Sequence, residues 1–85
     1  GEEGEKMELL EINSWLQDFF DHSRFRSTEL ILNKEKLYAY IKPLSFMRAL
    51  TNIISNAEKY STHAEFSFEA NENNLIFTLE DNGPG

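Results

Sequence analysis

The sequence contains no cysteine, which excludes both disulfide bonds and thiolate chemistry. No apolar run approaches the length needed to cross a bilayer, and no signal peptide is visible. Basic residues are scarce, because eight Lys and Arg stand against fifteen Asp and Glu, for a formal net charge of −7. This balance argues against nucleic acid as the main partner, since phosphate contacts need clustered cations. It still permits one bound nucleotide, whose charge Mg²⁺ and local donors can offset.

The 85 residues suffice for one small domain with a modest core. Hydrophobic residues make up 40% of the chain and aromatic residues 13%, which is typical of a globular protein and not of a disordered one. We expect residues 1–8 to form a polar, disordered or tag-like tail, and residues 9–85 to form the domain.

A first helix is predicted over roughly residues 13–24 by apolar residues at helical spacing. Asn13 or Ser14 is expected to cap it, and Ser14 and Gln17 have the spacing of a capping box. With Trp15 beside it, the apolar stripe indicates core packing and not a cofactor site. Its members are Leu9, Ile12, Leu16, Phe19 and Phe20.

Two pairs of strands are expected on either side of a second helix. Residues 28–32 and 37–41 are short β-rich runs separated by a polar turn, which predicts a hairpin. Residues 64–70 alternate between apolar and polar side chains, and 75–80 form an apolar strand after another turn. The order helix, hairpin, helix, hairpin predicts two helices on one face of a sheet, an α/β (α+β) two-layer sandwich.

The second helix, over residues 44–60, has two contrasting faces. Pro43 suits its first turn. At about 100° per residue, one broad face is apolar, and polar residues fall on the opposite face within an arc of about 80°. The apolar face comprises Phe46, Met47, Leu50, Ile53, Ile54 and Ala57; the polar stripe comprises Arg48, Asn52, Asn56 and Lys59.

Asn52 and Asn56 lie one turn apart on the polar stripe. Two interpretations are open. The two asparagines can belong to an ordinary solvated surface, although Asn has a slightly unfavourable helix propensity. Alternatively, an amide oxygen can ligate Mg²⁺ while the NH₂ group donates to phosphate, with Arg48 and Lys59 supplying positive charge.

The run Asp81-Asn82-Gly83-Pro84-Gly85 follows directly from the last expected strand. Ordinary turns use the same residues. In a functional interpretation, a carboxylate at a strand end accepts a hydrogen bond from an adenine amino group, and the glycines allow the backbone to approach the ligand.

Together, segments 44–61 and 79–85 resemble the N box and the G1 box of two-component sensor histidine kinases, within the wider GHKL (Bergerat-fold) ATP-binding superfamily. The sequence pattern of the first segment is most similar to that of osmosensor kinases of the EnvZ type. It runs Pro43-Leu44-Ser45 … Arg48-Ala49 … Asn52 … Asn56-Ala57 … Tyr60. The resemblance covers about residues 8–85. It implies an incomplete Bergerat fold, with two helices on one face of a mostly antiparallel or mixed sheet.

The resemblance also implies roles for individual positions. Asn56 would ligate Mg²⁺, and Asn52 and Lys59 would attend the phosphates of ATP. Tyr60 would lie against the base or ribose, although a helix-end aromatic that covers the core is an equal alternative. The remaining roles are that Asp81 holds the adenine amino group and that Gly83 and Gly85 shape the pocket floor and the root of the ATP lid.

One position separates the subclasses of the superfamily. Its hydrolases and anti-sigma-type kinases usually carry Glu four residues before the magnesium Asn, placed to activate water or a hydroxyl. Here that residue is Asn52, which favours phosphoryl transfer to a histidine on another domain. His22 and His63 lack the sequence context of a phosphoacceptor and are interpreted as surface histidines, so no catalytic residue is assigned within the chain.

The resemblance implies that the parent protein is a protein-histidine kinase. It would bind Mg–ATP, phosphorylate a helical dimerisation and phosphoacceptor domain, and signal to a response regulator. The parent would be an inner-membrane sensor with this domain on the cytoplasmic side.

The sequence stops before the lid and the second Gly-rich loop of the family. We therefore expect the 85 residues alone to be inactive, to bind nucleotide weakly or not at all, and to self-associate or exchange strands through an open sheet edge. Two alternatives stay open: a non-catalytic interaction or regulatory module, and a part of a GHKL ATPase, which Asn52 disfavours.

Overall fold

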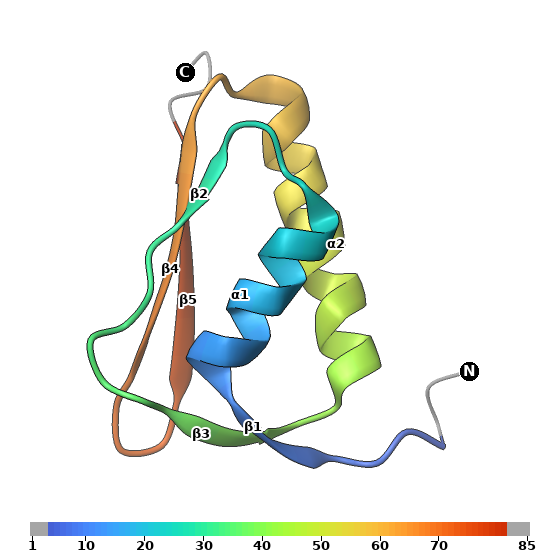
Figure 1. Ribbon diagram of the computed structural model, residues 1–85, viewed down its shortest axis with the longest axis vertical. Coiled ribbons are helices and arrows are strands. Elements are labelled where there is room, and N and C mark those ends of the chain that lie inside the picture. Colours follow the sequence, from blue (N-terminus) through green and yellow to red (C-terminus); the bar gives the residue numbers. More distant parts are fainter. Residues whose placement is uncertain (1–3, 82–85) are drawn as a thin grey trace.

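A computed structural model describes residues 4–81. Two helices lie on one side of a three-stranded sheet, and a separate two-stranded ribbon runs across one end of the helices (Figure 1). The predicted two-layer α+β arrangement is therefore confirmed. In chain order the elements are β1 (Glu8–Glu11), α1 (Ile12–Ser23), β2 (Thr28–Leu30), β3 (Tyr38–Ile41), α2 (Pro43–Tyr60), β4 (Ala64–Ala70) and β5 (Leu75–Asp81).

The larger sheet has the order β2-β4-β5, with β2 parallel and β5 antiparallel to β4. The second predicted hairpin is confirmed, since β4 and β5 pair from Ala64 opposite Asp81 to Ala70 opposite Leu75. A side-chain oxygen closes its turn: Asn71 Oδ1 accepts hydrogen bonds from the backbone N–H groups of the two residues that precede β5, at 3.2 and 2.9 Å.

The first predicted hairpin is wrong, because β2 and β3 belong to different sheets. β2 pairs with β4, and β3 pairs antiparallel with β1. The polar run between them is a connection anchored by Asn33, whose Nδ2 donates to the Phe68 carbonyl at 3.2 Å. The Asn33 backbone N–H donates to Asn13 Oδ1 at 3.0 Å. Composition identified both strands, but long-range contacts select their partners.

The helix predicted over 13–24 is present as α1, but its predicted cap is wrong. Glu11 is the N-cap, and its carboxylate accepts hydrogen bonds from the backbone N–H groups of Asn13 (2.9 Å) and Ser14 (3.2 Å). Gln17 donates to Asp21 and takes no part in a capping box. Leu9, placed on the helix by its spacing, lies in β1 and is 55% exposed.

Both helices contribute to one core. Its buried members are Ile12, Leu16 and Phe19 from α1, Leu50 and Ile54 from α2, and Phe66 and Phe68 from β4. Aromatic rings connect the layers: Phe20 of α1 lies 5.7 Å from Phe66 of β4, and Phe46 of α2 lies 5.2 Å from Phe77 of β5. Helix α1 therefore packs over the β2–β4 side of the sheet, whereas α2 packs over β5.

The apolar face of α2 is narrower than its periodicity predicts. Leu50, Ile54 and Ala57 are buried, but Met47 is 39% exposed and Ile53 is 54% exposed. Met47 lies on the flank of α2 that faces α1, and Ile53 lies on the other flank. Ile53 belongs to the apolar face by its periodicity, but its side chain is mostly exposed.

Within residues 4–81, neither helix is long and apolar enough to span a membrane. Part of the segment expected to be a tail contacts the domain: Glu8 begins β1, and the Glu5 carboxylate accepts hydrogen bonds at the start of α2.

Candidate functional site

The outer flank of α2 presents amide and apolar side chains together. Ile53, Asn56 and Tyr60 fall within an arc of about 60° on this helix, and Asn52 lies about 40° beyond Asn56. All four side chains are exposed, with 65% of Tyr60 accessible. Because α1 contacts the opposite flank, this flank faces past β5, the strand that pairs only with β4 among residues 4–81. Exposed Ile and Tyr beside two amides suit a ligand with a flat apolar part and a polar part.

The amides of Asn52 and Asn56 are uncommitted. Among the described residues, neither side chain makes a hydrogen bond, whereas the amides of Asn13, Asn33 and Asn71 are all engaged in holding loops and turns. Amides on an ordinary solvated surface would also lack hydrogen bonds within the protein. Their oxygen atoms are nevertheless free to accept a cation, and their NH₂ groups are free to donate.

Asp81 lies at the end of the fold where α2 ends. It is paired with Ala64, the first residue of β4, which follows α2 after a short connection (Figure 1). Alternate residues of a strand share a face, so Asp81 lies on the same face as Leu79 and Phe77. The β4 partners on that face are buried beneath the helices. Asp81 therefore belongs to the helix-covered face, as a carboxylate pointing toward a ligand beside α2 requires.

Five cavities are defined by residues 4–81, and they lie away from most of these groups. Asn52, Asn56, Tyr60 and Asp81 do not line any of these five cavities. Lys59 is exposed and lines a cavity of about 350 Å³ with Arg24 and other residues. The roles of these five residues as ligands of a nucleotide or of Mg²⁺ stay predictions. The predictions for Gly83 and Gly85 lie outside the described residues.

Glu58 is the carboxylate closest in sequence to the amide pair, and it is fully occupied. It accepts hydrogen bonds from the Arg26 N–H (2.7 Å), the Ser27 N–H and hydroxyl (2.9 and 3.0 Å) and the Thr28 hydroxyl (2.6 Å). Desolvation raises the pKa of Glu58, but the hydrogen bonds from Thr28, Ser27 and Arg26 outweigh it and lower this pKa to about 2. Glu58 therefore ties α2 to the start of β2, and it is a poor base.

Sequence reasoning missed this function of Glu58. Its partners lie about thirty residues away in the chain and donate two backbone N–H groups and two hydroxyls, so no local pattern reveals them.

The two histidines are exposed, as predicted. His22 Nδ1 lies 2.8 Å from the Asp18 carbonyl oxygen on α1, within one turn of the same helix. His63 Nε2 lies 3.6 Å from Glu65 Oε2 at the start of β4.

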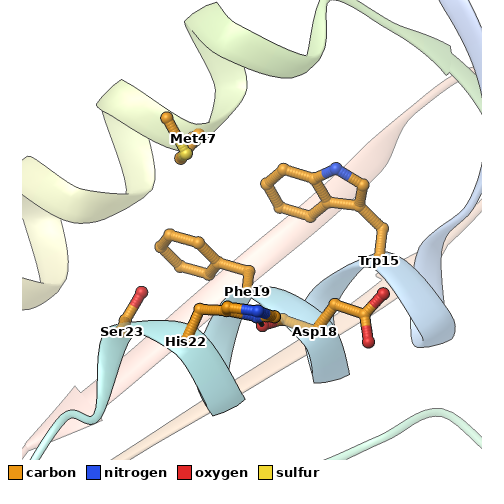
Figure 2. A pocket seen from close by; sticks show the side chains of 6 residues that line it. All are labelled: Trp15, Asp18, Phe19, His22, Ser23 and Met47. Carbon is orange, nitrogen blue, oxygen red and sulfur yellow. Dashed lines mark hydrogen bonds between the residues drawn. The ribbon is translucent and has the colours of Figure 1, made fainter.

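A groove of about 320 Å³ separates α1 from the inner flank of α2 (Figure 2). Trp15, Phe19 and Met47 form its apolar walls, and the rings of Trp15 and Phe19 are stacked with centroids 5.4 Å apart. Trp15 also packs on Phe46, at 4.8 Å. This agrees with the prediction that Trp15 is a packing residue, and it places the groove on the flank of α2 opposite Ile53.

Comparison with known proteins gives matches to solved structures alone. No protein-family model matches the chain, and no curated protein does. Over most of its length the chain has the structure of histidine kinase ATP-binding domains, so the resemblance identified from the N box and the G1 box is confirmed.

Two solved structures illustrate the match. The histidine kinase domain of the E. coli osmosensor EnvZ superposes with a TM-score of 0.77 and 29% identity, covering 94% of this chain and 52% of that one. The ATP-binding domain of PrrB from Mycobacterium tuberculosis gives a TM-score of 0.76 at 21% identity, over 94% of this chain and 62% of that one. The chain thus spans between about half and two thirds of the length of these domains.

A third match is the Acinetobacter baumannii histidine kinase AdeS. It has a TM-score of 0.70 and 24% identity over 93% of this chain and 43% of that one. At such identities, the likeness to PrrB and AdeS establishes the fold and does not by itself extend to activity.

Proposed function

We propose that this chain is part of the ATP-binding domain of a protein-histidine kinase. In the complete protein, the γ-phosphoryl group of ATP passes to a histidine on a helical dimerisation domain, and then to an aspartate of a response regulator. The observation that carries the proposal is the match to the EnvZ histidine kinase domain over 94% of the chain. We place the domain on the cytoplasmic side of a membrane-anchored sensor.

The outer flank of α2 supplies the nucleotide ligands in this proposal. Asn56 ligates Mg²⁺, and Asn52 and Lys59 contact the phosphates. Tyr60 lies against the base or ribose with the exposed Ile53 next to it. Asp81 accepts a hydrogen bond from the adenine amino group, and Gly83 and Gly85 allow the backbone to approach the base.

The donor chemistry suits Mg²⁺, which prefers oxygen ligands and keeps several of its waters. One uncommitted amide oxygen, at Asn56, is therefore a sufficient protein ligand when phosphate oxygens complete the shell. Bound Mg²⁺ neutralises phosphate charge; the contribution of Asn52 and Lys59 is to orient the phosphates for transfer.

Transfer to a histidine is favoured over hydrolysis by the lack of a free carboxylate on this flank. Position 52 is Asn, and Glu58 is committed to Ser27 and Thr28 with its pKa lowered to about 2. Neither can take a proton from water at neutral pH. A hydrolase of the same superfamily is accordingly the weaker candidate.

The test is a titration with Mg–ATP, in which NMR chemical-shift changes report binding to the 85-residue chain and to the complete protein. In the complete protein we expect Mg–ATP to shift the signals of α2 residues 52–60, and Asn56→Ala or Asp81→Asn to weaken binding at least tenfold. In the 85-residue chain we expect weak binding or none. Asn73→Ala, which removes an amide in the β4–β5 turn, is the matched control and should bind like wild type. Equal binding by the wild type and by both site variants of the complete protein would refute the assignment of the pocket.

A further inference from the structure

The start of α2 lacks a cap from its own sequence. Its N-cap residue is Lys42, which makes no side-chain hydrogen bond to the helix, and the first turn contains no acidic residue. Lysine is a poor N-cap, because it cannot accept a hydrogen bond from the free N–H groups of the first turn.

Glu5 supplies the missing acceptor from a distant part of the chain. One carboxylate oxygen accepts a hydrogen bond from the Leu44 N–H, and the other accepts from the Ser45 N–H at 3.1 Å and the Ser45 hydroxyl at 2.8 Å. A carboxylate at this position also interacts favourably with the helix dipole. Desolvation opposes ionisation, yet these hydrogen bonds keep the pKa of Glu5 below its ordinary value.

The register of the ribbon explains how Glu5 reaches α2. In the antiparallel pair of β1 and β3, Glu8 lies opposite Ile41. Continuing that register outward places Glu5 opposite Leu44. The segment ahead of β1 therefore runs alongside the connection between β3 and α2, beneath the lower end of α2 in Figure 1.

The turn held by Glu5 carries an aromatic residue that joins both layers. Phe46 packs on Trp15 of α1 at 4.8 Å and on Phe77 of β5 at 5.2 Å. Fraying of this turn would withdraw Phe46 from both contacts, whereas the more distal part of α2 is held separately through Glu58.

We propose that residues 4–7 act as a strap whose Glu5 clamps the first turn of α2, so that displacement of this segment loosens α2 and its Phe46 contacts. Segment position is thereby coupled to helix position. A consequence that rests on the proposed function is that the strap also controls the placement of Asn52 and Asn56, farther along the same helix.

Amide hydrogen exchange by NMR tests the strap without any nucleotide. In Glu5→Ala, we expect exchange at Leu44, Ser45 and Phe46 to accelerate about fivefold, in line with the loss of an N-cap. Glu5→Gln, which keeps an acceptor and loses the charge, should give an intermediate rate. Glu8→Ala is the matched control, because Glu8 is an exposed glutamate of β1 without a hydrogen bond to α2.

Two results would overturn the proposal. The first is exchange at Leu44 and Ser45 that is unchanged in Glu5→Ala or equally accelerated in Glu8→Ala. The second is equal acceleration in the core strand β4, at Phe66 and Phe68, which would indicate global destabilisation and not local release. Failure of nucleotide binding would leave both readouts unaffected, so the two proposals fail separately.

Discussion

The Thr28 hydroxyl donates a 2.6 Å hydrogen bond to the Glu58 carboxylate and so connects the first residue of β2 to the last turn of α2. Glu58 accepts three more hydrogen bonds from Arg26 and Ser27. A carboxylate that satisfies this many donors stabilises the fold only while it is ionised.

This relationship predicts an acid-sensitive component of stability. The pKa of Glu58 is about 2 in the folded chain against an ordinary value of 4.5, so its stabilisation is complete above about pH 4.5 and is lost as the pH falls toward 2. We expect Glu58→Gln to lower the free energy of unfolding at pH 7 by about 1–2 kcal/mol, and to flatten the pH dependence between pH 4.5 and 2. Urea unfolding across this range measures both, with Glu69→Gln, on an exposed position of β4, as control.

Adjacent isoleucines of α2 should separate stability from binding. Ile54 is completely buried, and Ile54→Ala is expected to cost about 2–5 kcal/mol. Ile53 is mostly exposed, so Ile53→Ala should change stability by less than about 0.5 kcal/mol while weakening Mg–ATP binding in the complete protein. Thermal unfolding and calorimetric titration distinguish the two; a large loss of stability in Ile53→Ala would contradict the position assigned to its side chain.

Removal of the α1 cap should lower the free energy of unfolding, and a shorter carboxylate at the same position should restore much of it. Glu11→Ala leaves the N–H groups of Asn13 and Ser14 without their acceptor, for a loss of about 1 kcal/mol. Glu11→Asp should recover much of this loss, because Asp is a good N-cap residue. Chemical unfolding of the wild type and of both variants is the measurement. A Glu11→Ala variant as stable as the wild type would show that the cap contributes little.

The edge of β5 predicts self-association of the 85-residue chain. Among residues 4–81, β5 pairs only with β4, and Ile76 of β5 is 40% exposed. Unpaired edges with apolar residues invite strand pairing, which an added charge opposes. We expect light scattering to show oligomers that grow with concentration, and Ile76→Lys to shift the population toward monomer. A wild-type chain that is monomeric at all concentrations would contradict this expectation.

Local signals were sufficient for α2 and for the β4–β5 hairpin. Pro43 and a long 3.6-residue periodicity define the helix, and the turn between the strands is closed by the neighbouring Asn71. These features depend on residues close together in the chain, so a single sequence contains them.

Contacts between distant residues could not be predicted in this way. Glu5, Glu11 and Glu58 look like ordinary surface acids, yet each one binds backbone N–H groups, and for Glu5 and Glu58 those groups lie thirty to forty residues away. The parallel partner of β2 was equally hidden, because β-propensity identifies a strand and not its neighbour. For the candidate site, periodicity placed Asn52 and Asn56 on one stripe but could not show that the neighbouring Ile53 is exposed.

The parallel pairing of β2 with β4 has a consequence for the order in which this chain can fold during synthesis. The strand neighbours of Thr28, Glu29 and Leu30 are Ala64, Glu65 and Phe66, so a nascent chain that has not yet exposed β4 lacks the larger sheet on which α1 packs. Until then Phe20 lacks Phe66, its contact in the sheet. The apolar side of α1 therefore stays uncovered by this sheet until β4 has left the ribosome. During that interval the growing chain is exposed to aggregation through this surface.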